Sequence, residues 1–600
     1  MLHRRALKAV WNQLNRQAMA SLKDRNWSAW SRRLAAIAVC VLSALSPGCH
    51  EPVPAETTAA PGPRWFEDVT QSSGLDFVHD AGPIDGRYFL PQVMGSGAAL
   101  FDFDRDGRLD ILLLQNGGPQ SGSKNRLYRQ DRPGHFVDVS AGSGLDYAGY
   151  CMGVAIGDVN NDGWPDVVIT EYRGVRLFLN NGDGRTFRDA TREAGLENLH
   201  WGTSAAFLDY DRDGWLDLVV ANYLDYDPSV QCASGGGRPA YCHPRSFHGS
   251  VTKLFHNLGR QKGGGVRFED VTLASGLGRQ PGPGLGLLCA DFDGDGWPDI
   301  FVANDAKPNH LWINQHDGTF KEDAAFHGLA LNGTGHAQGN MGTALGDVTG
   351  RGLFDVFVSH LTEETHTLWV QGPRGFFRDG TGRAGLAEPS WRGTGFGTAL
   401  GDFDQDGALD LAIVNGRVSR GRTVENPALS AFWRDYAERN QVFRNDGRGH
   451  FRDLSASNPD FCGVAMVSRG LAMGDLDGDG ALDLLVTTVA GRARLYRNVA
   501  AQRGHWLMVR AVDPRLRRDA YGAEIVVDAG GKRQRRWINP GQSYLCSHDV
   551  RAHFGLGEAQ LVARIEVQWP DGLREEFSGI ATDQVVTLER GRGRRPGVTR

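Results

Sequence analysis

Seven short segments of the chain place oxygen-donor side chains at a fixed spacing. They begin at Asp102, Asp158, Asp209, Asp291, Asp347, Asp402 and Asp475, and all except the copy at Asp347 follow the pattern D-x-D-x-D-G-x-x-D, with Asn allowed at the third position. Carboxylates a few Å apart repel one another strongly unless a cation neutralises them. Numerous hard oxygen ligands favour calcium over zinc or copper. The pattern therefore predicts calcium sites, with solvated acidic turns that hold no metal as the alternative.

Six of the seven loops have a complete set of donors. The expected ligands are Asp102, Asp104, Asp106 and Asp110; Asp158, Asn160, Asp162 and Asp166; Asp209, Asp211, Asp213 and Asp217; Asp291, Asp293, Asp295 and Asp299; Asp402, Asp404, Asp406 and Asp410; and Asp475, Asp477, Asp479 and Asp483. We therefore expect about six calcium ions per chain.

The fifth loop, Asp347 to Asp355, departs from the pattern. Thr349 and Arg351 stand where the other loops have carboxylates, so we expect this loop to be empty of calcium. A guanidinium can bind carboxylates directly. The sequence thus suggests that Arg351 lies between Asp347 and Asp355 as an internal cation.

An EF-hand loop shares the first six positions of this pattern. It also requires a Glu at position twelve and a helix on either side. Here position twelve is apolar, as at Leu113 and Val220, and position nine opens an apolar, strand-like run. The ninth-position Asp is the expected last ligand, and each loop is predicted to join two strands.

The segments around each loop also recur, at a regular interval that is longer after the third and sixth loops. A Gly-rich run precedes the loop, an N-x-L-aromatic run follows it, and an F-x-D run comes next. Four short strands per repeat are typical of a β-propeller blade. The seventh copy lacks its F-x-D strand, whereas "WFEDVT" stands unpaired before the first loop. We therefore predict a seven-bladed propeller over residues 64–500 in which the N-terminal strand completes the last blade.

These repeats resemble the FG-GAP or VCBS calcium-binding repeats of integrin α-chain propellers. The phrases "YCHPRSFHG", "RDAYGAEIVV", "INPGQSYLCSHDVRAHFGLG" and "IEVQWPDG" resemble the bacterial relatives of cartilage acidic protein, in which an ASPIC/UnbV domain follows the propeller. Alternating apolar and polar runs over residues 501–590 predict a small antiparallel β-sandwich or barrel, followed by a tail at 591–600. The basic run Lys532 to Arg536 within residues 501–590 indicates either an anion-binding patch or a strand face exposed to solvent.

The N-terminus has the features of an export signal. Arg32 and Arg33 precede an apolar run that ends near Ser46-Pro47-Gly48-Cys49, and this run is too short to span a bilayer. Residues 1–48 are predicted to be removed, either by lipoprotein processing that lipidates Cys49 or by ordinary signal cleavage. Residues 49–63 are then predicted to form a flexible tether. The expected location is periplasmic, outer-membrane-anchored or extracellular.

Cys232 and Cys242 bracket a Gly-rich insert. An oxidising compartment permits a disulfide between them, with two free thiols as the alternative. The other four cysteines of the expected mature domains lie in apolar runs and read as buried small hydrophobes. A net charge of −6 and 40% apolar residues fit a globular protein and argue against a nucleic-acid partner.

No familiar catalytic motif occurs in the chain. The candidate polar residues of a functional site are His243, His336, His360 and His548. Inserts at 223–253 and 417–439 add surface to the propeller, and the second one is predicted to contain a short helix.

The primary hypothesis for the function is an exported calcium-binding module that binds a protein or glycan. The alternative is a calcium-dependent enzyme that uses the propeller channel and the inserts above it.

Overall fold

The computed structural model describes residues 62–262, 265–389 and 391–596. The predicted export signal, Cys49 and most of the tether lie outside these residues. The described chain is nearly all β, as predicted, and forms one compact unit from Gly62 onward. No helix in the described part of the chain is long and apolar enough to cross a membrane.

Each acidic loop joins the first two strands of a four-stranded antiparallel sheet, which we call a blade. The Gly-rich runs form the inner strands, which are β2 (Ala98–Phe101), β6 (Cys151–Gly157), β10 (Gly202–Leu208), β16 (Gly284–Ala290), β20 (Thr343–Gly346), β24 (Gly395–Gly401) and β28 (Ser468–Gly474). The apolar runs after the loops form the second strands, which are β3 (Asp110–Leu113), β7 (Asp166–Glu171), β11 (Asp217–Asn222), β17 (Asp299–Asn304), β21 (Asp355–Val358), β25 (Asp410–Asn415) and β29 (Asp483–Thr488).

The aromatic and F-x-D runs form the outer half of each blade. The third strands are β4 (Arg126–Arg132), β8 (Gly174–Asn180), β14 (Lys253–Arg260), β18 (His310–Asn314), β22 (Thr367–Gln371), β26 (Gln441–Asn445) and β30 (Arg494–Asn498). The fourth strands are β5 (His135–Asp138), β9 (Phe187–Asp189), β15 (Val266–Asp270), β19 (Phe320–Glu322), β23 (Phe377–Asp379), β27 (Phe451–Asp453) and β1 (Phe66–Asp68). The N-terminal β1 pairs with β30, so it completes the sheet of the seventh repeat as expected.

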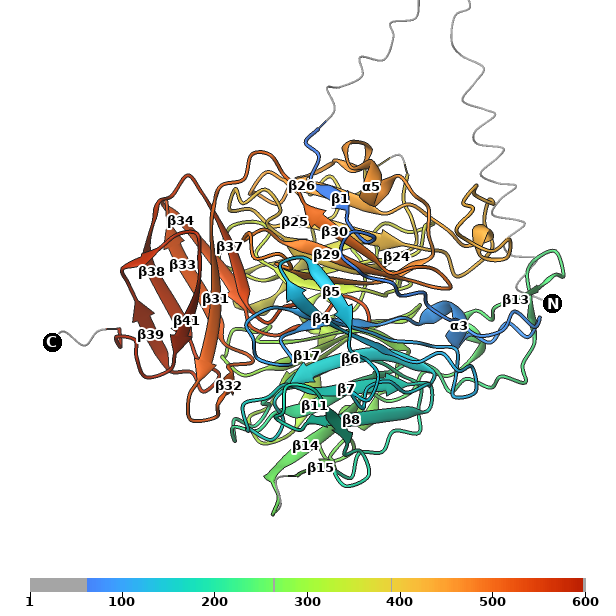
Figure 1. Ribbon diagram of the computed structural model, residues 1–600, viewed down its shortest axis with the longest axis horizontal. Helices are drawn as coiled ribbons and strands as arrows, with labels where there is room; N and C mark the ends of the chain where they lie inside the picture. Colours follow the sequence, from blue (N-terminus) through green and yellow to red (C-terminus); the bar gives the residue numbers. More distant parts are fainter. Residues whose placement is uncertain (1–61, 263–264, 390, 597–600) are drawn as a thin grey trace, which may run out of the picture. The chain divides into compact units, whose positions relative to one another are not determined.

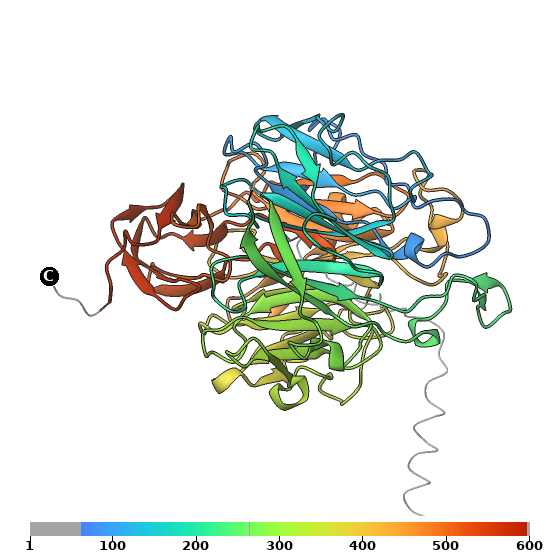
Figure 2. The same cartoon turned by 90° about the horizontal axis from the view of Figure 1, so that it is seen from below.

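The blades are arranged in a ring, because each inner strand contacts the inner strands of its two neighbours and β28 contacts β2. The inner strands are almost wholly buried, and their glycines allow this close approach. A Cβ on Gly342 would lie 1.8 Å from the carbonyl oxygen of Phe396 in the next blade. Figures 1 and 2 show these propeller-like sheets in blue to orange.

A buried side-chain amide links each blade to the one before it. The amide belongs to the last Asn of the third strand, or to a Gln in blades one and five, and it donates to the main-chain carbonyl just after the first Asp of the preceding loop. The bonds are 2.8–3.0 Å long and run from Gln130 to Leu476, Asn180 to Phe103, Asn257 to Val159, Asn314 to Tyr210, Gln371 to Phe292, Asn445 to Val348 and Asn498 to Phe403. The seven bonds together close the ring.

Replacing one of these amides is expected to destabilise the ring. Asn257 also donates to the Leu216 carbonyl and accepts from the Gly259 amide, so Asn257→Ala leaves several buried polar groups without partners. We expect a loss of about 3 kcal/mol in unfolding free energy, measured by denaturant or thermal unfolding. Exposed Asn181, which bonds only Thr186 through its side chain, is the control, and Asn181→Ala should change stability by less than about 0.5 kcal/mol. Equal effects of the two substitutions would contradict this role.

The C-terminal region is a two-sheet sandwich. One sheet contains β32 (Arg518–Asp519), β31 (His505–Asp513), β37 (Ala552–Gly557) and β41 (Gln584–Glu589), and the other contains β34 (Lys532–Trp537), β33 (Glu524–Ala529), β38 (Leu561–Gln568), β39 (Arg574–Phe577) and β40 (Ile580–Ala581). Their apolar faces share one core. The prediction of a wholly antiparallel domain is wrong in one place, because β41 pairs with β31 in parallel.

Residues 539–549, which we call the plug, leave this sandwich and enter the centre of the ring. The plug contains β35 (Gly541–Gln542) and β36 (Cys546–Ser547), and β36 pairs with inner strand β2. Ser543 exchanges two backbone hydrogen bonds with Thr343 of blade five, and its side chain accepts from the Thr398 amide of blade six. The plug contacts the inner strands of all seven blades. The ring therefore has a filled centre.

The inserts contain little regular structure. The first holds a short hairpin of β12 (Cys232–Ala233) and β13 (Pro239–Ala240), which is joined by a Cys232–Cys242 disulfide, and then η1 (Pro244–Ser246). The predicted helix in the second insert is wrong apart from one 3-10 turn, η4 (Trp433–Asp435), because the chain straightens to form bridges from Ala437 to Gly416 and from Glu438 to Met466. The other short helices are α3 (Pro91–Met94), α4 (Ala324–His327), α5 (Pro459–Cys462), η2 (Leu277–Arg279), η3 (Pro373–Gly375) and η5 (Ser455–Ser457).

Candidate metal centres

The first and ninth aspartates of every loop hold the loop's own backbone. In the first loop, Asp102 accepts the amides of Asp106 and Gly107, while Asp110 accepts those of Phe103 and Gln130. The fifth loop keeps most of these bonds, since Asp347 accepts the Arg351 and Gly352 amides and Asp355 accepts that of Gln371 in the third strand, although the Val348 amide bonds the Gly346 carbonyl instead of Asp355. These two positions are therefore required by the fold whether or not a metal binds.

The carboxylates at the third and fifth positions are not required by the fold, because the loop that begins at Asp347 folds without them. In the other loops these side chains add negative charge close to the aspartates at the first and ninth positions. Single carboxylate oxygens lie within 4.8 Å of one another in Asp102, Asp104 and Asp110; in Asp209, Asp211 and Asp213; in Asp291, Asp293 and Asp295; and in Asp402, Asp404 and Asp410. The structure thus contains acidic clusters that can hold a metal ion.

Burial disfavours the charged form of several of these carboxylates. Desolvation, with the neighbouring carboxylates adding to it, raises the pKa of Asp110 to about 8 and that of Asp402 to about 8. The same causes raise the pKa of Asp166, Asp299 and Asp410 well above the usual range. A divalent cation would offset both the repulsion and the desolvation. The donor set is almost entirely oxygen, which suits calcium.

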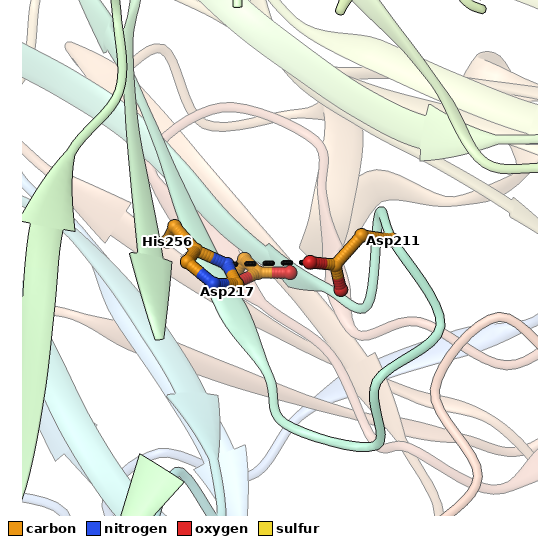
Figure 3. A group of neighbouring side chains, drawn as sticks. All are labelled: Asp211, Asp217 and His256. Carbon is orange, nitrogen blue, oxygen red and sulfur yellow. Dashed lines mark hydrogen bonds and ion pairs between the residues drawn. The ribbon is translucent and has the colours of Figure 1, made fainter. Parts of the chain in front are cut away.

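Third-strand side chains also reach several of the loops, although the loop pattern alone does not predict them. Arg129 lies 2.8 Å from Asp104, and Arg444 lies 2.9 Å from Asp404. His256 Nδ1 lies 3.1 Å from Asp217 and 3.5 Å from Asp211, within reach of both carboxylates (Figure 3). The hydrogen bond to Asp217 raises the pKa of His256 to about 9. The available signal was the residue after the aromatic in "NRLYR", "TKLFHN" and "NQVFRN".

The position of Arg351 in the fifth loop agrees with the prediction for Asp355 but not for Asp347. Its guanidinium donates to the Thr349 hydroxyl at 2.7 Å and to the Gln371 carbonyl at 2.8 Å, and it lies 3.4 Å from Asp355. Asp347 contacts it only through the main-chain amide. The cation therefore sits beside Asp355 and does not bridge the two aspartates.

Restoring the missing donors is expected to create another calcium site. The Thr349→Asp, Arg351→Asp double variant would place four carboxylates on a loop whose backbone already matches the others. We expect it to bind one more calcium per chain than the parent, counted by equilibrium dialysis or mass spectrometry under native conditions. Thr349→Ser, Arg351→Lys is the control without new carboxylates. An unchanged calcium count in the double aspartate variant would contradict the assignment of positions three and five as ligands.

The loop ends of the blades face the C-terminal sandwich. Arg518 donates to Asn161 and to the Gly214 carbonyl, Arg535 to the Gly352 carbonyl and Lys532 to the Asp406 carbonyl. The basic run at 532–536 is thus neither an open anion patch nor simply a solvated face, because Lys532 and Arg535 dock on acidic loops. The four histidines do not converge on one site. His243 and His336 are exposed, whereas His360 and His548 are buried in separate places.

Comparison with known proteins agrees with this architecture. The FG-GAP-like repeat model matches residues 102–169, 158–220, 291–358 and 429–486, and the ASPIC and UnbV model matches residues 513–595. Cartilage acidic protein 1 of Xenopus tropicalis is 26% identical over 511 residues, which cover 80% of this chain and 71% of that protein. Human cartilage acidic protein 1 is 27% identical, with 80% and 70% covered.

More distant matches cover part of the chain. Human integrin alpha-7 is 25% identical over 211 residues, which cover 33% of this chain and 16% of the integrin. Among solved structures, a Bacillus licheniformis rhamnogalacturonan lyase matches with a TM-score of 0.33 at 14% identity, covering 67% of this chain and 71% of that one. The chain is therefore an FG-GAP-repeat protein with a C-terminal ASPIC and UnbV domain, homologous to cartilage acidic protein 1 and to the FG-GAP regions of integrin α chains.

Proposed function

We propose that this chain is an exported, calcium-stabilised propeller that binds a protein or glycan through the face built by its inserts. Calcium would occupy the six complete loops and fix the ends of the blades, with no catalytic part in the function. The observation that carries the proposal is a cluster of half-buried aromatic side chains at the end of the ring away from the acidic loops.

The chain topology places this cluster opposite the loops. The acidic loops join the first and second strands of each blade, while both inserts join second and third strands and the segment before β2 joins a fourth strand to a first. Antiparallel strands put the latter connections at the other end of the blade. Figure 1 shows α3, β13 and the second insert gathered at that end.

The aromatic face combines the three segments into one surface. Tyr88 packs edge-on against Tyr241 at 5.2 Å and lies 5.9 Å from Phe432. Arg420 lies over the rings of Tyr88 and Phe432, at 5.5 and 6.0 Å from their centroids. Accessible tyrosine and arginine held by neighbouring rings are typical of protein-recognition hot spots, and rings of this kind also stack on sugars.

The catalytic alternative depends on an open channel beneath the inserts. The plug occupies the centre of the ring, and Tyr544 at its tip is fully buried against Phe396. His360 is also fully buried, and it bonds Thr367 and the Gly339 carbonyl. These features favour binding over catalysis at this end of the ring.

Export is the part of the proposal that rests on the sequence. The N-terminal signal and Cys49 lie outside the described residues, and lipidation of Cys49 or simple cleavage are both compatible with it. The Cys232–Cys242 disulfide supports an oxidising compartment. We propose that the mature chain is periplasmic, anchored to the outer membrane or extracellular.

The test is ligand capture by the calcium-loaded mature chain, on a glycan array and against cell-surface proteins, with binding then quantified for each hit. A true ligand should bind at least tenfold more weakly to Tyr88→Ala and Arg420→Ala, and normally to Arg448→Gln, which alters an exposed residue on blade six. Ligands that bind all of these variants equally would overturn the assignment of this face. Fractionation of cells that express the full chain would decide its location.

A further inference from the structure

A cavity lies at the end of the ring opposite the aromatic face, between blades one and two and the C-terminal sandwich. Its volume is about 260 Å³. Leu100, Leu109 and Ile156 of the ring and Tyr521 and Val550 of the sandwich provide apolar walls. It is therefore large enough for a small organic molecule and is not lined by charge alone.

The charges around this cavity are unbalanced once calcium is counted. Five arginines and four aspartates line it, and two of the aspartates, Asp102 and Asp158, are the first ligands of calcium loops. The lining therefore carries one more positive than negative side chain, and calcium bound in these two loops would offset part of the negative charge of Asp102 and Asp158 and so add to this excess. This step rests on the calcium part of the proposed function.

Two of the five arginines that line the cavity have no carboxylate partner among the described residues. Arg510 is paired with Asp519 at 2.6 Å, and Arg551 with Asp549 at 2.7 Å. Arg105 and Arg517 are exposed, line the cavity and make no ion pair within the described residues. Two guanidinium groups thus remain available to an incoming anion.

A buried donor also points to a ligand. His548 is 2% exposed and borders the cavity. Its Nδ1 accepts the Met473 amide at 2.8 Å, which places the proton of the neutral ring on Nε2, and Nε2 has no partner among the described residues. Burial lowers the pKa of His548 to about 3, so the ring is neutral at physiological pH. A buried N–H without an acceptor is costly, and an anionic oxygen would satisfy it.

We propose that this cavity binds a small carboxylate with an apolar body, such as an aromatic or branched aliphatic acid. The carboxylate bonds the His548 Nε2–H and the rim guanidinium groups of Arg105 and Arg517, and the apolar body lies against the hydrophobic walls. The site joins the propeller to the ASPIC and UnbV domain, so the bound acid stabilises their contact.

The test is calorimetric titration of the calcium-loaded chain with benzoate, with benzamide as the neutral control of the same shape. We expect benzoate to bind and to raise the melting temperature, and benzamide to bind at least tenfold more weakly. His548→Asn keeps an acceptor for Met473 but removes the Nε2 donor, and Arg105→Gln, Arg517→Gln removes the rim charges. Both variants should weaken benzoate binding tenfold or more, whereas Arg448→Gln should leave it unchanged.

The calcium content of the same samples separates the two proposals. If calcium binds but benzoate does not, or if benzamide binds equally well, the carboxylate site is overturned and the calcium sites stand. Unchanged benzoate binding in both cavity variants also overturns it. A chain that binds neither calcium nor benzoate overturns both proposals.

Discussion

Removing calcium with EGTA is expected to lower the melting temperature of the chain by about 10 °C or more, because ligand binding to the folded state adds stability at each occupied site. Six clusters of carboxylates would then lose their divalent cation, and a third-strand Arg129, His256 or Arg444 would offset the charge in only three of them. The effect should extend beyond the loops, since Lys532 and His553 of the sandwich bond the carbonyls of Asp406 and Gly480 in two complete loops. Differential scanning calorimetry would measure the change.

Two further measurements make this result specific to the metal. Adding excess calcium after EGTA should restore the original transition, and amide exchange should show the loss of protection in the six complete loops but little change in the fifth. The fifth loop is the internal control because Arg351 and Thr349 already satisfy Asp355. A melting temperature and an exchange pattern that EGTA leaves unchanged would contradict the metal assignment.

Much of the ring could be predicted from sequence because its signals are local and repeated. The loop pattern, the Gly-rich inner strand and the strand with an aliphatic–aromatic pair recur in most repeats, so "GDVTGRGLFDVF" is recognised as a loop even though Thr349 and Arg351 have replaced two donors. The missing last strand was also predictable, because "WFEDVT" had no partner of its own. In each case the evidence lies within a few residues.

The plug could not be predicted because nothing local specifies it. Ser543 and Leu545 adopt left-handed backbone conformations, with φ of 70° and 61°, which cost non-glycine residues about 1–2 kcal/mol each. Contacts with strands hundreds of residues away offset that cost. The predicted helix at Trp433 failed for a similar reason, since bridges to Gly416 and Met466 override the local preference. Docking of Lys532 and Arg535 on the acidic loops likewise depends on the tertiary fold.

Truncating the tip of the plug is expected to have the largest effect of any single substitution described. Tyr544 is fully buried, its ring centroid lies 4.8 Å from that of Phe396, and its hydroxyl donates to the Met94 carbonyl at 2.8 Å. Arg469 lies on the same Phe396 ring, 3.9 Å from its centroid. Tyr544→Ala leaves a cavity at the centre of the ring and exposes a buried cation to it, so we expect a loss of about 3–5 kcal/mol.

Graded substitutions separate packing from the hydrogen bond. Tyr544→Phe removes only the hydroxyl and should cost about 1 kcal/mol, whereas Phe326→Ala at an exposed ring should cost less than about 1 kcal/mol. Thermal unfolding of the calcium-loaded proteins would give this order. If Tyr544→Ala were as mild as Phe326→Ala, the plug would be a passive filler, and the sandwich would depend on the loop contacts alone to stay docked on the ring.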